Sequence, residues 1–142
     1  MTADFPDIES RTRSLAITVF DQFCRGLEGD DTALAEFIDG SHDDVIVYFP
    51  QGPNLGGPYT KAQLPEFFGF GREFYPTGLF ITLDRLFIAG DTAAFQIHDE
   101  ATTASGDEYR GTVFLSFQFK EGKLWRYREY FGLRWNNVQP FP

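Results

Sequence analysis

Residues 112–132 read TVFLSFQFKEGKLWRYREYFG, and this stretch decides the fold. It predicts two long strands joined at Glu121 and Gly122, because glycine permits the positive φ that a tight hairpin needs. If those two residues form the loop, Lys120 pairs with Lys123, and the pairing is expected to continue outward without interruption. Directly paired residues share a face of the sheet. The register therefore sorts the hairpin into two faces.

The two faces differ in character. One is aromatic with polar groups set into it, and we expect it to line a small-molecule pocket: Thr112, Phe114, Ser116, Gln118, Trp125, Tyr127, Glu129 and Phe131. The other is expected to form the outer surface of the sheet: Val113, Leu115, Phe117, Phe119, Leu124, Arg126, Arg128 and Tyr130. Helices can cover only one side of a sheet, so the apolar part of this second face would be left as a large exposed patch. We therefore expect a symmetric homodimer through it.

The rest of the chain predicts helices followed by strands. Apolar residues recur at three- and four-residue steps from Asp7 over about twenty residues, which indicates an amphipathic helix. The further predicted elements are a helix ending at Gly40, a short strand at 44–49, a third helix that begins at Thr60 or near Pro65, and strands at 79–89, 93–103, 109–119 and 124–131. Residues 51–58, rich in Gly and Pro, predict an ordered loop at a cavity rim. This order indicates an α+β fold in one domain, 1–142, with helices on one face of a curved antiparallel sheet.

The composition argues against several classes of function and partner. The chain has 142 residues, a formal net charge of −9 and 18% aromatic residues. The acidic balance and the scattered Lys and Arg argue against a nucleic-acid partner. No apolar run is long enough to cross a membrane, and no basic and apolar leader is present, so a cytoplasmic protein is expected. The single cysteine, Cys24, cannot form an internal disulfide, and no motif predicts a metal or a cofactor.

Three segments carry a family resemblance: DDVIVYFP at 43–50, GDTAAFQIHDEAT at 90–102 and FQFKEGKLWRYREYFGL at 117–133. With the order of the predicted elements, they resemble the nuclear transport factor 2-like fold, also termed ketosteroid isomerase-like. Within it, the chain looks closest to the SnoaL-like polyketide cyclases. The resemblance implies a cone-shaped cavity between three amino-terminal helices and the concave face of the sheet. It also implies frequent dimers through the outer face.

The resemblance places family site positions on this chain. The base of ketosteroid isomerases falls on Phe49, and their second, protonated acid falls on Ser116. The Arg and two Asp positions of limonene epoxide hydrolases fall on Gln96, His98 and Glu129. Only the last of these keeps a carboxylate, so borrowed chemistry is limited to it.

His98 and Glu129 form the candidate catalytic pair. An imidazole titrates near neutrality, and a carboxylate within hydrogen-bond reach would fix its tautomer and raise its basicity. If residues 104–106 form a three-residue connection with Gly106 left-handed, His98 pairs with Thr112 and is expected to join Glu129 on one face. A two-residue loop at Ser105 and Gly106 would instead turn His98 outward.

The leading prediction is a small enzyme that acts without a cofactor on an apolar small molecule. The expected chemistry is proton transfer, hydration or dehydration, with His98 as general acid or base and Glu129 orienting it. Gln96 and Tyr127 would position the substrate, and the other predicted lining residues are Phe49, Phe114, Ser116 and Trp125. The alternative is a non-catalytic ligand-binding or dimerisation module of the same fold.

Overall fold

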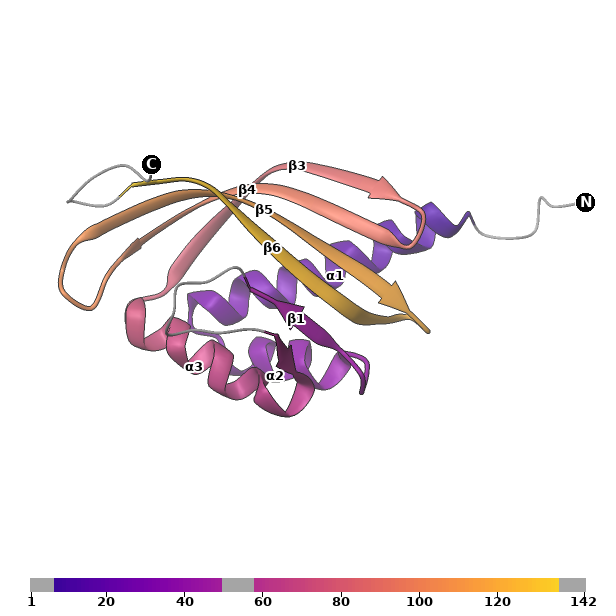
Figure 1. Cartoon of the computed structure of the whole chain (residues 1–142), viewed down its shortest axis with the longest axis horizontal. Helices are drawn as coiled ribbons and strands as arrows, with labels where there is room; N and C mark the ends of the chain where they lie inside the picture. Colours follow the sequence, from indigo (N-terminus) through magenta and orange to yellow (C-terminus); the bar gives the residue numbers. More distant parts are fainter. Residues whose placement is uncertain (1–6, 50–57, 136–142) are drawn as a thin grey trace, which may run out of the picture.

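The computed structural model describes residues 7–49 and 58–135, with the side chains of this set up to Tyr130. The predicted rim loop at 51–58 lies outside the described residues apart from Pro58. Three helices lie on one side of a single six-stranded sheet, as Figure 1 shows. The expected α+β architecture is confirmed.

The first two helices are bounded by capping residues. Helix α1 spans Ile8–Glu28; the Asp7 side chain accepts from the Glu9 N–H at its start, and Gly29 ends it in the left-handed conformation at φ 118°. Helix α2 spans Asp31–Gly40, and the Asp30 carboxylate accepts from the Ala33 N–H. These contacts satisfy N–H groups that a helix leaves without a partner. Both helices turn an apolar face to the sheet.

The third helix takes the later of its two predicted starts. A 3₁₀ turn, η1, spans Lys61–Gln63, and helix α3 follows at Leu64–Phe74. Pro65 lies in the first turn of α3, where a missing N–H costs nothing. The Gln63 side chain accepts from the Thr60 N–H at 2.9 Å, which holds the turn before the helix.

The sheet contains β1 (Ile46–Tyr48), β2 (Tyr59–Thr60), β3 (Leu79–Ala89), β4 (Thr92–Thr102), β5 (Glu108–Lys120) and β6 (Lys123–Trp135). Their spatial order is β2-β1-β6-β5-β4-β3. The four long strands form the expected antiparallel meander. However, β1 runs parallel to β6, so the sheet is mixed rather than purely antiparallel. Strand β2, only two residues long, was not predicted.

The register of the β5–β6 hairpin differs from the prediction. Lys120 pairs with Lys123 as expected, and Phe119 then pairs with Leu124, but the next pair is Gln118 with Arg126. Trp125 is the extra residue of a β-bulge. A one-residue slip moves every later side chain to the other face. The predicted pairing is therefore wrong for the whole of β6 beyond the turn.

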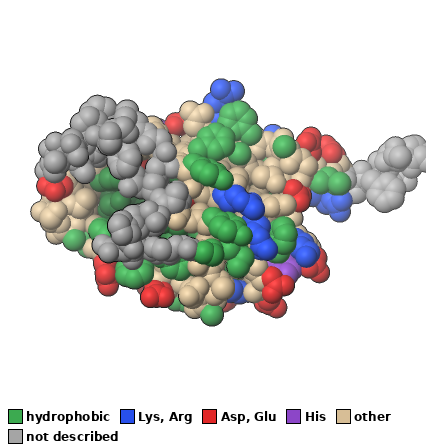
Figure 2. All heavy atoms as spheres, viewed as in Figure 1, with side chains coloured by type: hydrophobic (Ala, Val, Ile, Leu, Met, Phe, Trp, Pro, Cys, Tyr) green, Lys and Arg blue, Asp and Glu red, His purple; other side chains and the backbone are tan. Residues whose placement is uncertain are grey.

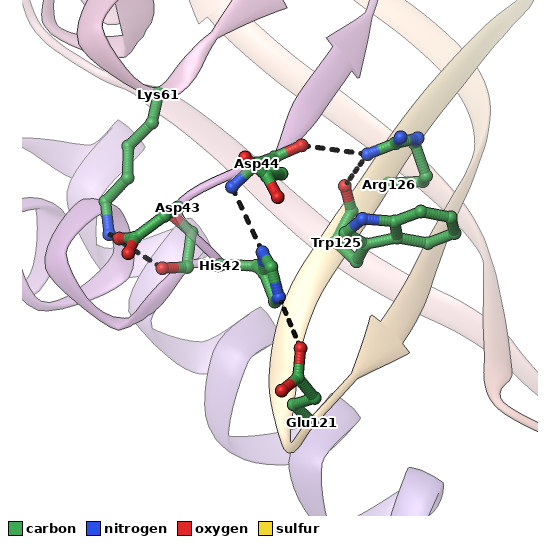
Figure 3. Close-up of polar contacts among 8 residues, drawn as sticks. His42, Asp43, Asp44, Lys61, Glu121, Trp125 and Arg126 are labelled. Carbon is green, nitrogen blue, oxygen red and sulfur yellow. Dashed lines mark hydrogen bonds and ion pairs between the residues drawn. The ribbon is translucent and has the colours of Figure 1, made fainter.

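Polar contacts hold the bulge in place (Figure 3). The Arg126 guanidinium donates to the carbonyl oxygens of Asp44 (2.9 Å) and Trp125 (2.8 Å). It also stacks 3.8 Å from the centre of the Trp125 ring. At the hairpin turn, His42 Nε2 donates to Glu121 Oε1 at 2.8 Å, while His42 Nδ1 accepts from the Asp44 N–H. The loop before β1 thus fastens the end of the hairpin where the bulge occurs.

The bulge exchanges the predicted inner and outer faces of β5. Of the residues expected outside, the apolar ones are in fact buried in the core: Val113, Leu115, Phe117, Phe119 and Leu124. Among them, Phe117 packs against Phe20 and Phe23 of α1. The Phe20 ring also stacks on Phe95 of β4, with centroids 4.4 Å apart. Phe23 meets both Phe117 and Tyr127. The concave face of the sheet is therefore the apolar one, and the helices cover it.

No helix among the described residues has the length and apolar character needed to cross a bilayer.

Candidate functional site

A cavity of about 210 Å³ opens between the helices and the concave face of the sheet. This volume is below the roughly 300–1,000 Å³ of pockets for drug-sized ligands, so the molecule it can enclose is small. Its helical wall is almost wholly apolar: Phe23 and Leu27 of α1, and Phe67, Phe68, Phe70, Gly71 and Phe74 of α3. Phe49, which follows β1, packs on Phe67 with ring centroids 5.2 Å apart.

The sheet wall supplies a carboxylate and a phenol from β6. Tyr127 and Glu129 are two residues apart, so both point to the concave face, and both line the cavity. The Tyr127 hydroxyl donates to Glu129 Oε1. Burial raises the pKa of Tyr127 well above its usual value, and the neighbouring Glu129 charge and hydrogen bond raise it further. Tyr127 is therefore a neutral hydrogen-bond donor at physiological pH, fixed against Glu129.

A second carboxylate comes from β4. Asp99 is 5% exposed and lines the same cavity as Glu129. It pairs across the strands with Gly111, and that glycine leaves room for it. A Cβ at Gly111 would lie 2.7 Å from Asp99 Oδ1 and 2.5 Å from the Tyr109 hydroxyl. The Asp99 charge makes a smaller contribution to the raised pKa of Tyr127, after burial and Glu129.

Three of the eight predicted site residues lie at the cavity: Phe49, Tyr127 and Glu129. The other five lie away from it, four at alternating positions of β4 and β5 and the last at the bulge of β6: Gln96, His98, Phe114, Ser116 and Trp125. Phe114 is 43% exposed, and Trp125 lies between Arg126 and Lys120 instead of lining a ligand site. The prediction that Phe114 and Ser116 line the pocket is wrong. Because of the bulge, these two residues lie on the opposite face of the sheet from Tyr127 and Glu129.

The predicted pairing of His98 with Glu129 does not form. The three-residue connection is correct: Gly106 is left-handed at φ 91°, and His98 pairs with Thr112. Thr112, however, faces outward, so His98 does too. His98 Nδ1 bonds to both carboxylate oxygens of Asp84, at 2.9 and 3.0 Å, on the convex side of the sheet.

Asp99 and Tyr109 are polar cavity residues that the sequence pattern did not predict. A signal for Asp99 was present, since it follows His98 directly, and adjacent strand residues point to opposite faces. Choosing His98 for the pocket excluded Asp99 from it. The error lay in the register of β6, not in the loop before β5.

The convex face carries a separate surface of aromatic and basic side chains. Five of its rings are exposed: Tyr48, Phe80, Phe87, Phe114 and Tyr130. The Arg85 guanidinium lies 5.0 Å from the Phe87 ring, and Arg128 lies 5.2 Å from Tyr48. Figure 2 shows hydrophobic and basic side chains side by side over β1 and β6. We refer to these seven residues as the convex patch.

Within the described residues, no three His, Cys, Asp or Glu side chains converge in a way that could hold a metal ion. Nor does a strand lead through a Gly-rich turn into a helix among them, which is the usual cradle for a nucleotide phosphate.

No family model matches the chain, and no curated protein sequence does. Among solved structures, an NTF2-like protein from Anabaena variabilis ATCC 29413 is 32% identical, with a TM-score of 0.78 over 86% of this chain and 90% of that one. A protein assigned to the SnoaL-like polyketide cyclases, from Jannaschia sp. CCS1, is 15% identical, with a TM-score of 0.73 over 90% of both chains. TerC, co-crystallised with polyporic acid, is 20% identical, with a TM-score of 0.71 over 87% of this chain and 92% of that one. The chain is therefore a member of the NTF2-like family.

Proposed function

We propose that the protein is a cofactor-independent acid–base enzyme that acts on a small, mostly apolar molecule held in the cavity. One observation carries the proposal: Glu129 meets the cavity while Tyr127, fully buried, donates to its Oε1. A carboxylate fixed by a neutral donor in an apolar cavity is suited to move a proton to or from a bound ligand. The acid–base role predicted for His98 is therefore assigned to the cavity carboxylates, because His98 lies on the convex side.

Two similar structures support a small-molecule role. One is assigned to the SnoaL-like polyketide cyclases, and another was crystallised with polyporic acid. In the proposed reaction, Glu129 takes a proton from a carbon next to a carbonyl group. The C–H bond breaks, its electron pair passes into the enolate, and Glu129 later returns a proton to carbon. Asp99 and Tyr127 would hold the ligand while this occurs.

Proton exchange tests the proposal without knowledge of the natural substrate. 2-Tetralone, a small bicyclic ketone, is incubated with the protein in D₂O, and deuterium uptake next to its carbonyl is followed by NMR. We expect the wild type to accelerate uptake and Glu129→Gln to lose at least about 100-fold of that rate, the low end for a general base. Glutamine keeps an oxygen that can accept from Tyr127.

Glu100→Gln is the matched control, because Glu100 is an exposed glutamate on β4 paired with Arg110. It is expected to exchange like the wild type. If 2-tetralone binds but exchange is no faster than in buffer, the acid–base proposal fails and the ligand-binding module is the better reading.

We also propose that two copies associate through the convex patch. The patch combines exposed aromatic rings with arginines, and this is the composition enriched at protein interfaces. It replaces the surface predicted from the uninterrupted hairpin, whose apolar residues are in the core.

A further inference from the structure

The polar groups of the cavity gather at two separate places on the sheet wall. The first pole is Tyr127 and Glu129 on β6. The second pole is Asp99 on β4 with Tyr109 on β5. Asp99 pairs with Gly111, whereas Glu129 pairs with Leu115, four residues further along β5. Four residues of strand span roughly 13 Å along the backbone, and the strands that carry the two carboxylates, β4 and β6, lie on opposite sides of β5.

The second pole is formed by two buried side chains that converge over one glycine. Asp99 Oδ1 and the Tyr109 hydroxyl both lie within 3.0 Å of the point where a Cβ at Gly111 would be. Both residues are buried, at 5% and 8% exposure, and the Tyr109 ring packs on Tyr75 with centroids 5.3 Å apart. A carboxylate and a phenol therefore converge over a residue that has no side chain.

The wall between the poles is apolar. Val113 lies between Gly111 and Leu115 on the concave face of β5 and pairs with Ile97 of β4. Val113, Leu115 and Ile97 all line the cavity, and the phenylalanines of α1 and α3 face them. A ligand that reaches both poles must therefore be apolar in its middle.

We infer that the ligand is a small bipolar molecule with a flat apolar body and a hydrogen-bond donor, such as a hydroxyl, at each of two opposite ends. This inference rests on the proposed function, because one of those ends is held at Glu129. Donors are required because each pole presents a carboxylate. A carboxylate has about four acceptor positions, so each can accept from the ligand alongside its protein partners.

The test uses three naphthalenes of nearly equal size: 2-naphthol, 2,6-dihydroxynaphthalene and 2,3-dihydroxynaphthalene. The 2,6 isomer carries hydroxyls at opposite ends, whereas the 2,3 isomer carries both at one end. Calorimetric titration is expected to give the 2,6 isomer about tenfold tighter binding than either other compound, the value of one hydrogen bond to a charged group. Equal affinity of the 2,6 and 2,3 isomers overturns the inference.

Variants of the second pole show where the extra affinity arises. Asp99→Asn and Tyr109→Phe are expected to cut the advantage of the 2,6 isomer to about twofold or less. Tyr130→Phe, which removes an exposed hydroxyl on the convex face, keeps the full advantage. Tyr109→Phe deletes one atom, so it answers the question even if Asp99→Asn fails to fold. An advantage that survives in Tyr109→Phe and Asp99→Asn overturns the inference.

The results distinguish failure of the proposed function from failure of the inference about the second end of the ligand. If 2-naphthol loses affinity in Glu129→Gln while the 2,6 isomer gains nothing, the first pole is supported and only the second end of the ligand is wrong. If none of the three naphthalenes binds, the inference of a bipolar ligand is overturned, and deuterium uptake by 2-tetralone still decides the proposed function.

Discussion

Adding a single methyl group at Gly111 tests the convergence of Asp99 and Tyr109. In Gly111→Ala, the new Cβ would lie 2.5 Å from the Tyr109 hydroxyl, 2.7 Å from Asp99 Oδ1 and 3.1 Å from Tyr109 Cζ. All three contacts are tighter than ordinary van der Waals separation, and both side chains are buried. At least one of them must shift.

The expected cost combines two opposing effects. Overpacking of a buried site costs typically about 1–3 kcal/mol. Replacing glycine by alanine gains about 0.4–1 kcal/mol by restricting the unfolded chain, and Gly111 has no positive φ to oppose it. We therefore expect Gly111→Ala to be about 1–2 kcal/mol less stable than the wild type.

Urea unfolding followed by circular dichroism measures this cost. A lower midpoint with an unchanged m-value identifies a change in stability. In a Tyr109→Phe background the closest of the three contacts is absent, so the penalty of Gly111→Ala should fall by about 1 kcal/mol, a typical coupling energy for touching residues. The control is Gly40→Ala, where a Cβ would meet nothing within 4 Å. A Gly111→Ala protein as stable as the wild type would show that the two oxygens do not converge there.

Three further outcomes are expected. Tyr127→Phe removes a buried hydrogen bond to a carboxylate and should cost about 1.5–3 kcal/mol at pH 7 by urea unfolding. Because the pKa of Tyr127 is raised in the folded protein, its contribution to stability is complete below about pH 10 and is lost above it. The free energy of unfolding of Tyr127→Phe should therefore fall less steeply with alkaline pH than that of the wild type. Parallel stability curves for the two proteins would contradict this. Phe114→Glu should convert a wild-type dimer to monomer by light scattering at micromolar concentration, whereas Ile17→Glu, at an exposed position on α1, should not; a monomeric wild type would refute the interface. Burial raises the pKa of Cys24 to about 12, so the native thiol should react with a disulfide reagent at pH 8 at least roughly 100-fold more slowly than the unfolded thiol, and equal rates would refute the burial.

Much of the fold could be predicted because its signals are local. Asp7 and Asp30 cap helices, Gly29 ends one, and Gly106 and Gly122 take the positive φ of tight turns. Each of these depends on a few neighbouring residues. The same turn residues predicted the strand boundaries to within one residue at most strand ends.

The candidate site was only partly predictable because it depends on register across strands. The bulge at Trp125 is held by Asp44 and His42, from a loop about eighty residues earlier in the chain. The Asp44 carbonyl that holds Arg126 lies outside the hairpin. One clue was available: the uninterrupted register put Arg126 and Arg128 on the same face as Phe117 and Leu115, which mixes charge with the most apolar strand. The bulge separates them.

The parallel pairing of β1 with β6 was not predicted for a similar reason. The partners are separated by about eighty residues, and a three-residue strand carries too little pattern to choose a neighbour. Once formed, this pairing places Phe49 beside the cavity and Tyr48 on the convex patch.

In the proposed function, the chemistry lies with Glu129 on the concave face and not with His98 on the convex face. Deuterium uptake by 2-tetralone, measured in parallel for Glu129→Gln and His98→Ala, tests it most directly. We predict that His98→Ala exchanges at the wild-type rate and that Glu129→Gln loses at least about 100-fold. Loss of exchange in His98→Ala, with Glu129→Gln unaffected, would contradict the role of Glu129 as the catalytic base.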